Sequence, residues 1–179
     1  MAILILGITG VAGAVSGAFR VFASDSEALA KGGAFVGEAD NPSAVFYNPA
    51  GLTQLEDGYH LSLGLTAIQP MVKEINPSGA ETQMRLETFK VPHFYFVSGV
   101  GHAAIGIGST SNWGVSTDWA KDSFSAFVAT KTELQDLDNL LTLSYAINDQ
   151  LSVGVGGVYD ISSKRRKNRD FGDEHDDTR

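Results

Sequence analysis

The sequence contains no cysteine, and this absence excludes several kinds of site. Disulfide bonds, thiolate nucleophiles, iron–sulfur clusters and cysteine-based zinc sites all need that residue. Basic residues are also in the minority, with 13 Lys and Arg against 21 Asp and Glu and a net charge of −8. A protein that binds nucleic acid must bring Lys and Arg to the phosphates, so nucleic acid is not expected as a partner.

Long apolar runs are missing from most of the chain as well. Beyond the N-terminus no stretch of about 18 apolar residues occurs, which excludes a membrane-spanning helix there. Residues 1–17 differ, because they carry no charged side chain and end in small residues. We expect a secretory signal peptide over residues 1–17, although the basic residue that usually precedes the apolar stretch is missing. A buried core helix is the alternative.

No group of residues has the spacing of a catalytic or cofactor site. The four histidines lack the spacing of metal ligands, and neither a phosphate-binding loop nor a nucleophile elbow is present. The glycines at 106 and 108 lack the third glycine of a dinucleotide loop and lie inside an expected strand. We therefore expect no enzymatic activity, no cofactor and no metal site.

The part of the chain before residue 58 is predicted to be helical and rich in turns. Ser24 or Asp25 can cap a first helix, which a Gly-Gly pair is expected to end. The dipeptide at 41–42 is Asn-Pro, which favours the start of a second helix. Pro49 interrupts this second helix, because proline lacks an amide donor and clashes with the preceding turn.

After residue 58 the hydrophobic period changes from 3.6 to 2 residues, which predicts β-strands. In each segment, aliphatic residues on one face alternate with Gly, Ser, Thr or Asp on the other. The expected strands are 61–67, 89–97, 103–113, 134–146 and 151–163. Most of them are longer than the strands of soluble sandwiches, which average about 5–6 residues.

The connections between these strands alternate in length. Tight turns at 99–101 and 148–149 contrast with long stretches at 70–88 and 114–133. Short turns at one end and long loops at the other are typical of an outer-membrane β-barrel, whose apolar face meets lipid and whose polar face lines the lumen. A secreted β-sandwich that binds a ligand is the alternative, since an apolar face can also meet a second sheet.

Three blocks of the sequence, 26–52, 109–119 and 129–156, occur together in a recognisable order and spacing. The first block contains the tripeptide Asn-Pro-Ala, and the other two fall on the expected third, fourth and fifth strands. In these features the chain resembles the FadL/TodX family of outer-membrane transporters for long-chain fatty acids and other hydrophobic compounds. The resemblance covers residues 18–163.

This resemblance implies site residues in two places. The Asn-Pro-Ala signature belongs to the N-terminal hatch, which acts as a gate in the lumen, and the third strand kinks inward and leaves a lateral opening. The residues concerned are Asn48, Pro49 and Ala50 in the hatch and Ser111, Asn112 and Gly114 at the opening. Arg166 lies close to a position where the family can place a cation for a fatty-acid carboxylate.

The resemblance also implies the overall organisation. We expect an all-β fold with a small N-terminal helical hatch over 18–57 and an incomplete antiparallel transmembrane β-barrel over 58–163, with five strands of a larger barrel. Residues 164–179 are highly charged and are expected to be an outer-loop tail or a scar of truncation.

The implied function is transport of hydrophobic compounds, fatty acids or aromatic hydrocarbons, across the outer membrane of a Gram-negative-type bacterium. The mechanism would be hatch-gated passive diffusion with lateral release. The partners would be hydrophobic small molecules and outer-membrane lipid, and the complete barrel would be monomeric. A truncated, non-functional remnant of such a transporter is the alternative.

Overall fold

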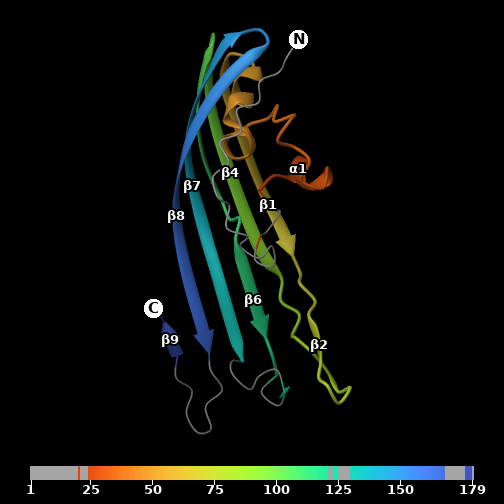
Figure 1. Cartoon of the computed structure of the whole chain (residues 1–179). Helices are drawn as coiled ribbons and strands as arrows, with labels where there is room; N and C mark the ends of the chain where they lie inside the picture. The colour runs from red at the N-terminus through yellow and green to blue at the C-terminus, as the bar shows by residue number, and fades with distance from the viewer. Residues whose placement is uncertain (1–19, 21–23, 121–122, 125–129, 168–175, 179) are drawn as a thin grey trace.

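The alternating segments fold into one curved antiparallel sheet (Figure 1). The computed structural model describes residues 20, 24–120, 123–124, 130–167 and 176–178, so the expected signal peptide lies outside the described residues. The wall strands follow one another in the order β1 (Gly58–Ile68), β4 (Phe89–Val100), β5 (Ala103–Thr110), β7 (Lys131–Asn148) and β8 (Leu151–Lys167). The sheet is open, with β1 at one edge and β8 followed by a short strand at the other.

The two faces of this sheet are arranged in the reverse of a soluble protein. On β7, Leu141 and Leu143 are each 53% exposed, whereas Thr142 and Ser144 are only 2% and 6% exposed. The same outward aliphatic rows occur on β1 and β8. An apolar outer face with a polar inner face is the pattern of a barrel wall in lipid. The predicted fold class, an all-β partial barrel with few short helices, is confirmed.

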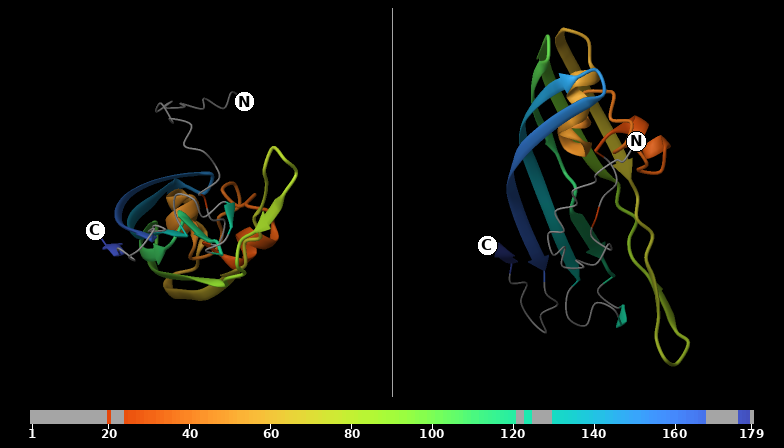
Figure 2. Two further views of the ribbon diagram at one scale, coloured as in Figure 1. Left: turned by 90° about the horizontal axis from the view of Figure 1, so that it is seen from below. Right: turned by 45° about the horizontal axis from the view of Figure 1, so that its top comes forward.

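A small helical segment, the hatch, lies on the concave side of the sheet, and Figure 2 shows the strands curving around it. It contains α1 (Ser26–Ala30), α2 (Ala44–Tyr47) and the 3₁₀ helix η2 (Pro49–Gln54). Asp25 caps α1 as predicted, because its Oδ1 accepts hydrogen bonds from the amides of Glu27 and Ala28, each 2.9 Å long. Gly32 and Gly33 then adopt positive φ angles and end the helix.

The second hatch helix follows an Asn-Pro turn, and Pro49 interrupts the helical stretch as predicted. The Oδ1 atom of Asn41 accepts hydrogen bonds from both the amide and the hydroxyl of Ser43. Pro49 not only ends α2 but also begins η2, where its missing amide is one that a first helical turn leaves unbonded anyway.

Glycines on the concave face let the hatch pack directly onto the strands. A Cβ atom on Gly106 would lie 2.4 Å from Val45 Cγ2, and one on Gly154 would lie 2.5 Å from the backbone nitrogen of Ala50. Val45 is almost fully buried in a core that also includes Leu52. Hatch and wall therefore share one core, and the glycines provide the space for it.

The expected third strand, 103–113, ends earlier than predicted, and a further strand follows it. β5 ends at Thr110, and β6 (Gly114–Asp118) begins after a break, inside the stretch 114–133 that was expected to be a loop. Both strands pair with the same edge of β7. Alternation alone does not reveal this break, because the polar residues that cause it fit a strand pattern.

The long connection after β1 contains a hairpin that the sequence analysis missed. Strands β2 (Lys73–Ile75) and β3 (Glu81–Gln83) pair with each other in a separate two-stranded sheet. The turn between them depends on Asn76, whose Oδ1 accepts the amide of Ala80 at 2.8 Å. Such polar turn chemistry leaves no hydrophobic period to detect.

The charged segment after residue 163 also begins as strand. β8 continues to Lys167, and β9 (Asp176–Thr178) pairs with the last three residues of β8. Residues 168–175 and 179 lie outside the described residues. The end of the wall therefore lies beyond the position that was expected, and the domain boundaries at 17, 57 and 163 remain predictions.

Candidate functional site

The break between β5 and β6 interrupts the wall of the sheet. β5 makes its last pair with β7 at Thr110 and Asp138, and β6 makes its first pair at Gly114 and Gln135. Residues 111–113 cross from one strand to the other. This is the position at which the sequence analysis expected the lateral opening, with Ser111, Asn112 and Gly114.

A carboxylate on β7 stabilises the break. The amide of Trp113 donates a 2.7 Å hydrogen bond to Oδ1 of Asp136, and the hydroxyl of Ser111 donates a longer one, 3.4 Å, to the same atom. A backbone amide that leaves a sheet ladder must find another acceptor when it is buried. Asp136 supplies that acceptor, so the interruption is a defined feature of the fold.

The break leaves a gap between β4 and β6. Residues 89–93 of β4 pair with β1 on one side, but pairing with β5 starts only at Phe94 and Ser109. Among the described strands, β6 pairs only with β7. Within the described residues, no strand fills the space between the start of β4 and β6.

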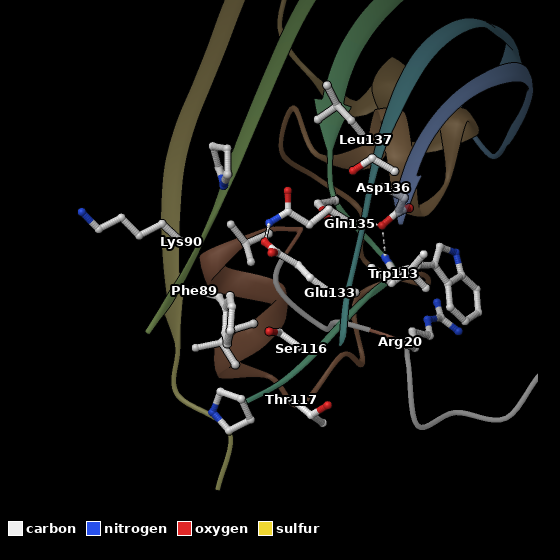
Figure 3. Close-up of a pocket in the computed structure, with 18 of the residues that line it drawn as sticks. Arg20, Phe89, Lys90, Trp113, Ser116, Thr117, Glu133, Gln135, Asp136 and Leu137 are labelled. Carbon is white, nitrogen blue, oxygen red and sulfur yellow. Dashed lines mark hydrogen bonds between the residues drawn. The ribbon is translucent and has the colours of Figure 1, made fainter. Parts of the chain in front are cut away.

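A cavity of about 700 Å³ lies at this gap (Figure 3). Its lining comes from both sides of the gap, with Phe89 and Val91 on β4 and Ser116 and Thr117 on β6, while Arg20 lies beside Trp113 at one end of the labelled group. A cavity of this size can hold a small-molecule ligand. Of the predicted opening residues, Ser111 and Gly114 line the cavity.

Asn112 faces inward and joins the break to the hatch. Its Oδ1 accepts a hydrogen bond from the Ser24 hydroxyl, and its Nδ2 donates to Oδ2 of Asp138. The hydroxyl of Tyr95 donates a 2.7 Å hydrogen bond to the backbone oxygen of Ser24. All four residues are buried. The start of the hatch is thus held directly to β4 and to the break, and through Asn112 to β7.

Sequence reasoning did not assign Ser24, Tyr95, Asp136 or Asp138 to this site. The two aspartates had been placed on the polar face of their strand, which was a usable signal. Ser24 was seen only as a possible helix cap. Its contact with Asn112 joins positions 88 residues apart, and no local pattern encodes such a distance.

The predicted gate residues of the hatch lie at a different place. The Nδ2 of Asn48 donates a 3.0 Å hydrogen bond to the backbone oxygen of Val36. This bond holds the segment between α1 and α2 to the start of η2. Pro49 and Ala50 pack against Gly154 of β8. None of the predicted gate residues lines the cavity at the break.

Arg166 lies in β8, opposite Thr132 on β7 and Asp177 on β9. It is not among the residues that line the cavity. Its expected contact with a ligand carboxylate therefore stays a prediction.

The outer surface of the hatch carries a small charge network. Nζ of Lys31 bonds Glu27 at 2.8 Å and Glu38 at 2.6 Å, and Nδ2 of Asn41 donates to Glu27 at 2.9 Å. The hydrogen bonds from Lys31 and then Asn41 hold the pKa of Glu27 below its ordinary value, and the same contacts with Glu27 and Glu38 raise the pKa of Lys31.

Among the residues that the structure describes, two groups of carboxylates have a spacing that could hold a cation. One is the exposed set Glu27, Glu38 and Asp40 on the hatch, which Lys31 already bridges in part. The other is Asp136 and Asp138 on β7 together with Asp160 on β8.

Across the described part of the chain, no helix is long and apolar enough to cross a membrane.

A family model and a curated relative match this sequence. The family described as outer membrane protein transport protein (OMPP1/FadL/TodX) matches residues 8–167. A long-chain fatty acid transport protein of Escherichia coli O6:H1 is 29% identical over 134 residues, which cover 70% of this chain and 30% of that protein. The chain therefore spans about a third of the length of this relative.

Two solved structures share the fold. A Pseudomonas aeruginosa FadL homologue gives a TM-score of 0.63 at 17% identity, covering 84% of this chain and 39% of the other. The P. putida toluene transporter TodX gives 0.62 at 20% identity, covering 71% and 33%. Because the family model matches residues 8–167, which is most of the sequence, this chain belongs to the outer-membrane protein transport family OMPP1/FadL/TodX.

Proposed function

We propose that this chain forms the hatch and the first wall strands of an outer-membrane channel that carries hydrophobic small molecules by passive diffusion. The observation that carries the proposal is the gap between β4 and β6 with its cavity, in a wall whose outer face is aliphatic. Family membership and the fold shared with a toluene transporter support the same substrate class. No residue of the site needs to form or break a covalent bond.

In this proposal the ligand leaves sideways through the gap into the membrane. Transfer of apolar surface out of water provides roughly 25 cal/mol per Å², which is enough to drive a hydrocarbon from a wet lumen into lipid. A gap also leaves backbone groups of β4 and β6 without strand partners, which is tolerable only where water or other protein groups reach them. The cavity at the break is the space that such water or ligand would fill.

The hatch is proposed to gate this route. Its core packs against the strand glycines, and its first described residues are held to the break by Ser24 and Asn112. A movement of the hatch would therefore change the position of the break as well. Asn48 contributes from the other end, because its side chain fixes the loop that precedes α2.

The absence of natural cysteine allows a direct test of the lateral opening. Ser111→Cys places a thiol in the cavity, and Ser98→Cys places one on β4 outside the cavity lining. Each substitution is introduced into the gene that encodes this protein, and each variant is produced in a host that has no transporter of this kind. A bulky maleimide on position 111 should block uptake of radiolabelled toluene or fatty acid, whereas the same label on position 98 should not.

Two results would count against the proposal. Equal uptake by the labelled and unlabelled Ser111→Cys proteins would remove the gap from the transport route. Recovery of the protein only in aggregates, with no insertion into the outer membrane, would favour the truncated remnant. The second case is recognised by the absence of heat-modifiable mobility in SDS gels, because closed barrels resist SDS until they are boiled.

A further inference from the structure

We propose that Asp136, Asp138 and Asp160 form a binding site for a divalent cation, namely Ca²⁺, on the concave face of the wall. Each of the three contributes one carboxylate oxygen, and these oxygens all lie within 4.8 Å of one another. Asp138 and Asp160 are directly opposite each other on β7 and β8. Asp136 lies two residues along β7 and so shares their face of the sheet.

One oxygen of this cluster lacks the partner that its burial demands. Asp136 is only 6% exposed, and its Oδ1 accepts the Trp113 amide. Its Oδ2 is buried and makes no hydrogen bond to any described residue. A buried carboxylate oxygen without a donor or cation is costly, so this atom points to a ligand that the polypeptide itself does not supply.

The hydrogen bonds that the structure gives to Asp138 and Asp160 bring no positive charge to the cluster. Asp138 accepts a hydrogen bond from the amide of Asn112, and Asp160 accepts one from the hydroxyl of Ser162, so both donors are neutral. Asp138 and Asp160, whose carboxylate oxygens are the neighbours of Asp136 in the cluster, carry charges of the same sign. Three carboxylates this close repel one another, and a divalent cation among them would turn that repulsion into attraction.

The donor set favours a hard cation, and the spacing of the oxygens accommodates Ca²⁺. Carboxylate oxygens suit hard cations, and Ca²⁺ binds its oxygens at about 2.3–2.6 Å, so two ligands on opposite sides lie up to about 5 Å apart. Mg²⁺ needs a smaller and more regular octahedron at about 2.0–2.1 Å. All the proposed ligands are carboxylate oxygens, so a search of the sequence for metal-binding histidines or cysteines does not detect this site. Asp160 is exposed, so water can complete the coordination shell.

A cation here would also act on the break. Asp136 and Asp138 are the same residues that accept the Trp113 amide and the Asn112 side chain. Binding would hold β8 to β7 and fix both acceptors in place. This inference stands on the cluster alone and does not depend on which compound the protein transports.

Calorimetric titration of CaCl₂ into the full chain, folded in detergent micelles, tests the site. We expect one Ca²⁺ per chain with a dissociation constant of about 0.1–1 mM, as in extracellular calcium modules. Asp160→Asn should weaken binding by about tenfold or more, since it removes one charged ligand from an exposed position. Asp149→Asn, at the exposed turn between β7 and β8, is the matched control and should bind like the wild type.

The arms of the experiment separate the possible outcomes. Asp136→Asn is the second variant, and circular dichroism of each sample establishes that the sheet is present. No Ca²⁺ binding by the wild-type chain overturns the proposal, and so does unchanged binding by both Asp160→Asn and Asp136→Asn. Tighter binding of Mg²⁺ than of Ca²⁺ overturns the assignment to calcium. Arg20 lines the same cavity as Asp136. Binding of Ca²⁺ by Arg20→Ala but not by the wild-type chain would also overturn the proposal, because it would show that the guanidinium occupies the site instead.

Discussion

Ser24 and Asn112 are 88 residues apart in the sequence, and their side chains are hydrogen-bonded to each other in the interior. The contact joins the first described part of the hatch to the interruption of the third wall strand. The Nδ2 atom of Asn112 also donates to Asp138, so both the oxygen and the nitrogen of its side-chain amide are hydrogen-bonded. Any movement of the hatch away from the wall must break this contact.

Asn112→Ala should destabilise the fold by about 1–3 kcal/mol, because it leaves a buried hydroxyl and a buried carboxylate without their partner. Urea unfolding in detergent micelles measures the loss. The matched control is Asn139→Ala on the same wall, where the amide makes only 3.4 Å hydrogen bonds to two backbone oxygens and is exposed. Equal stability of the two variants would show that Asn112 does not hold the hatch.

Close packing of the hatch on β8 gives a second prediction. A Cβ atom at Gly154 would meet the backbone of Pro49 and Ala50 at 2.6 and 2.5 Å, and backbone cannot move aside as a flexible side chain can. Gly154→Ala should therefore cost about 1–3 kcal/mol, the usual range for overpacking. It should also increase protease cleavage within the hatch.

Gly157 provides the control for this experiment, because a Cβ atom there would have nothing within 4 Å. Both variants add the same methyl group to the same strand, so they share any gain in strand propensity. We expect Gly157→Ala to be neutral or slightly stabilising. If Gly154→Ala behaves in the same way, the hatch does not sit against β8 as described.

The hatch network predicts a pH dependence with a defined sign. Lys31 and Asn41 hold the pKa of Glu27 below its ordinary value of 4.5. A carboxyl group whose pKa is lowered on folding contributes stability above its unfolded pKa, and this contribution is lost as the pH falls through the folded pKa. The order that Glu27 gives to the hatch should therefore persist at neutral pH and disappear below pH 4.5.

Lys31→Met tests this, because it keeps the aliphatic stem and removes the charge. An NMR titration of the Glu27 carboxyl carbon should show its pKa moving up towards the ordinary value, and the variant should lose hatch order near neutral pH but not in acid. Lys73→Met is the control, since Lys73 pairs with Glu81 in the separate hairpin. A Glu27 titration identical in Lys31→Met and wild type would contradict the assigned cause.

The strands could be predicted from sequence wherever one face is apolar over many residues. Alternation in Leu143 and its neighbours on β7 predicted both the strand and its outward side, because the period of a strand is two and lipid selects one face. The hairpin β2–β3 was missed, since its order comes from an Asn76 turn and an ion pair between Lys73 and Glu81. Such contacts leave no periodic signal.

The candidate site could be predicted only in part, for a related reason. The resemblance implied a lateral opening at Ser111, Asn112 and Gly114, which stays a prediction, while the structure has β5 ending at Thr110 and β6 beginning at Gly114. It did not reveal that Asp136 replaces a backbone acceptor, because an inward Asp fits the polar face of any barrel strand. Long-range partners such as Ser24 depend on how the hatch folds back, which spacing along the chain does not encode.

The reversed faces of the wall lead to the last prediction. Leu143 is half exposed on β7, and in a soluble protein the substitution of such a residue by arginine changes stability by less than about 0.5 kcal/mol. On a lipid-facing wall the same change costs about 2–4 kcal/mol near the middle of the bilayer. The size of the stability loss in Leu143→Arg therefore distinguishes a water-facing from a lipid-facing position. Met71→Arg is the control, because Met71 is even more exposed but lies outside the wall strands. In lipid vesicles, we expect urea unfolding to show a large loss of stability for Leu143→Arg and almost none for Met71→Arg. Equal, small effects of the two substitutions would mean that the aliphatic rows do not face lipid.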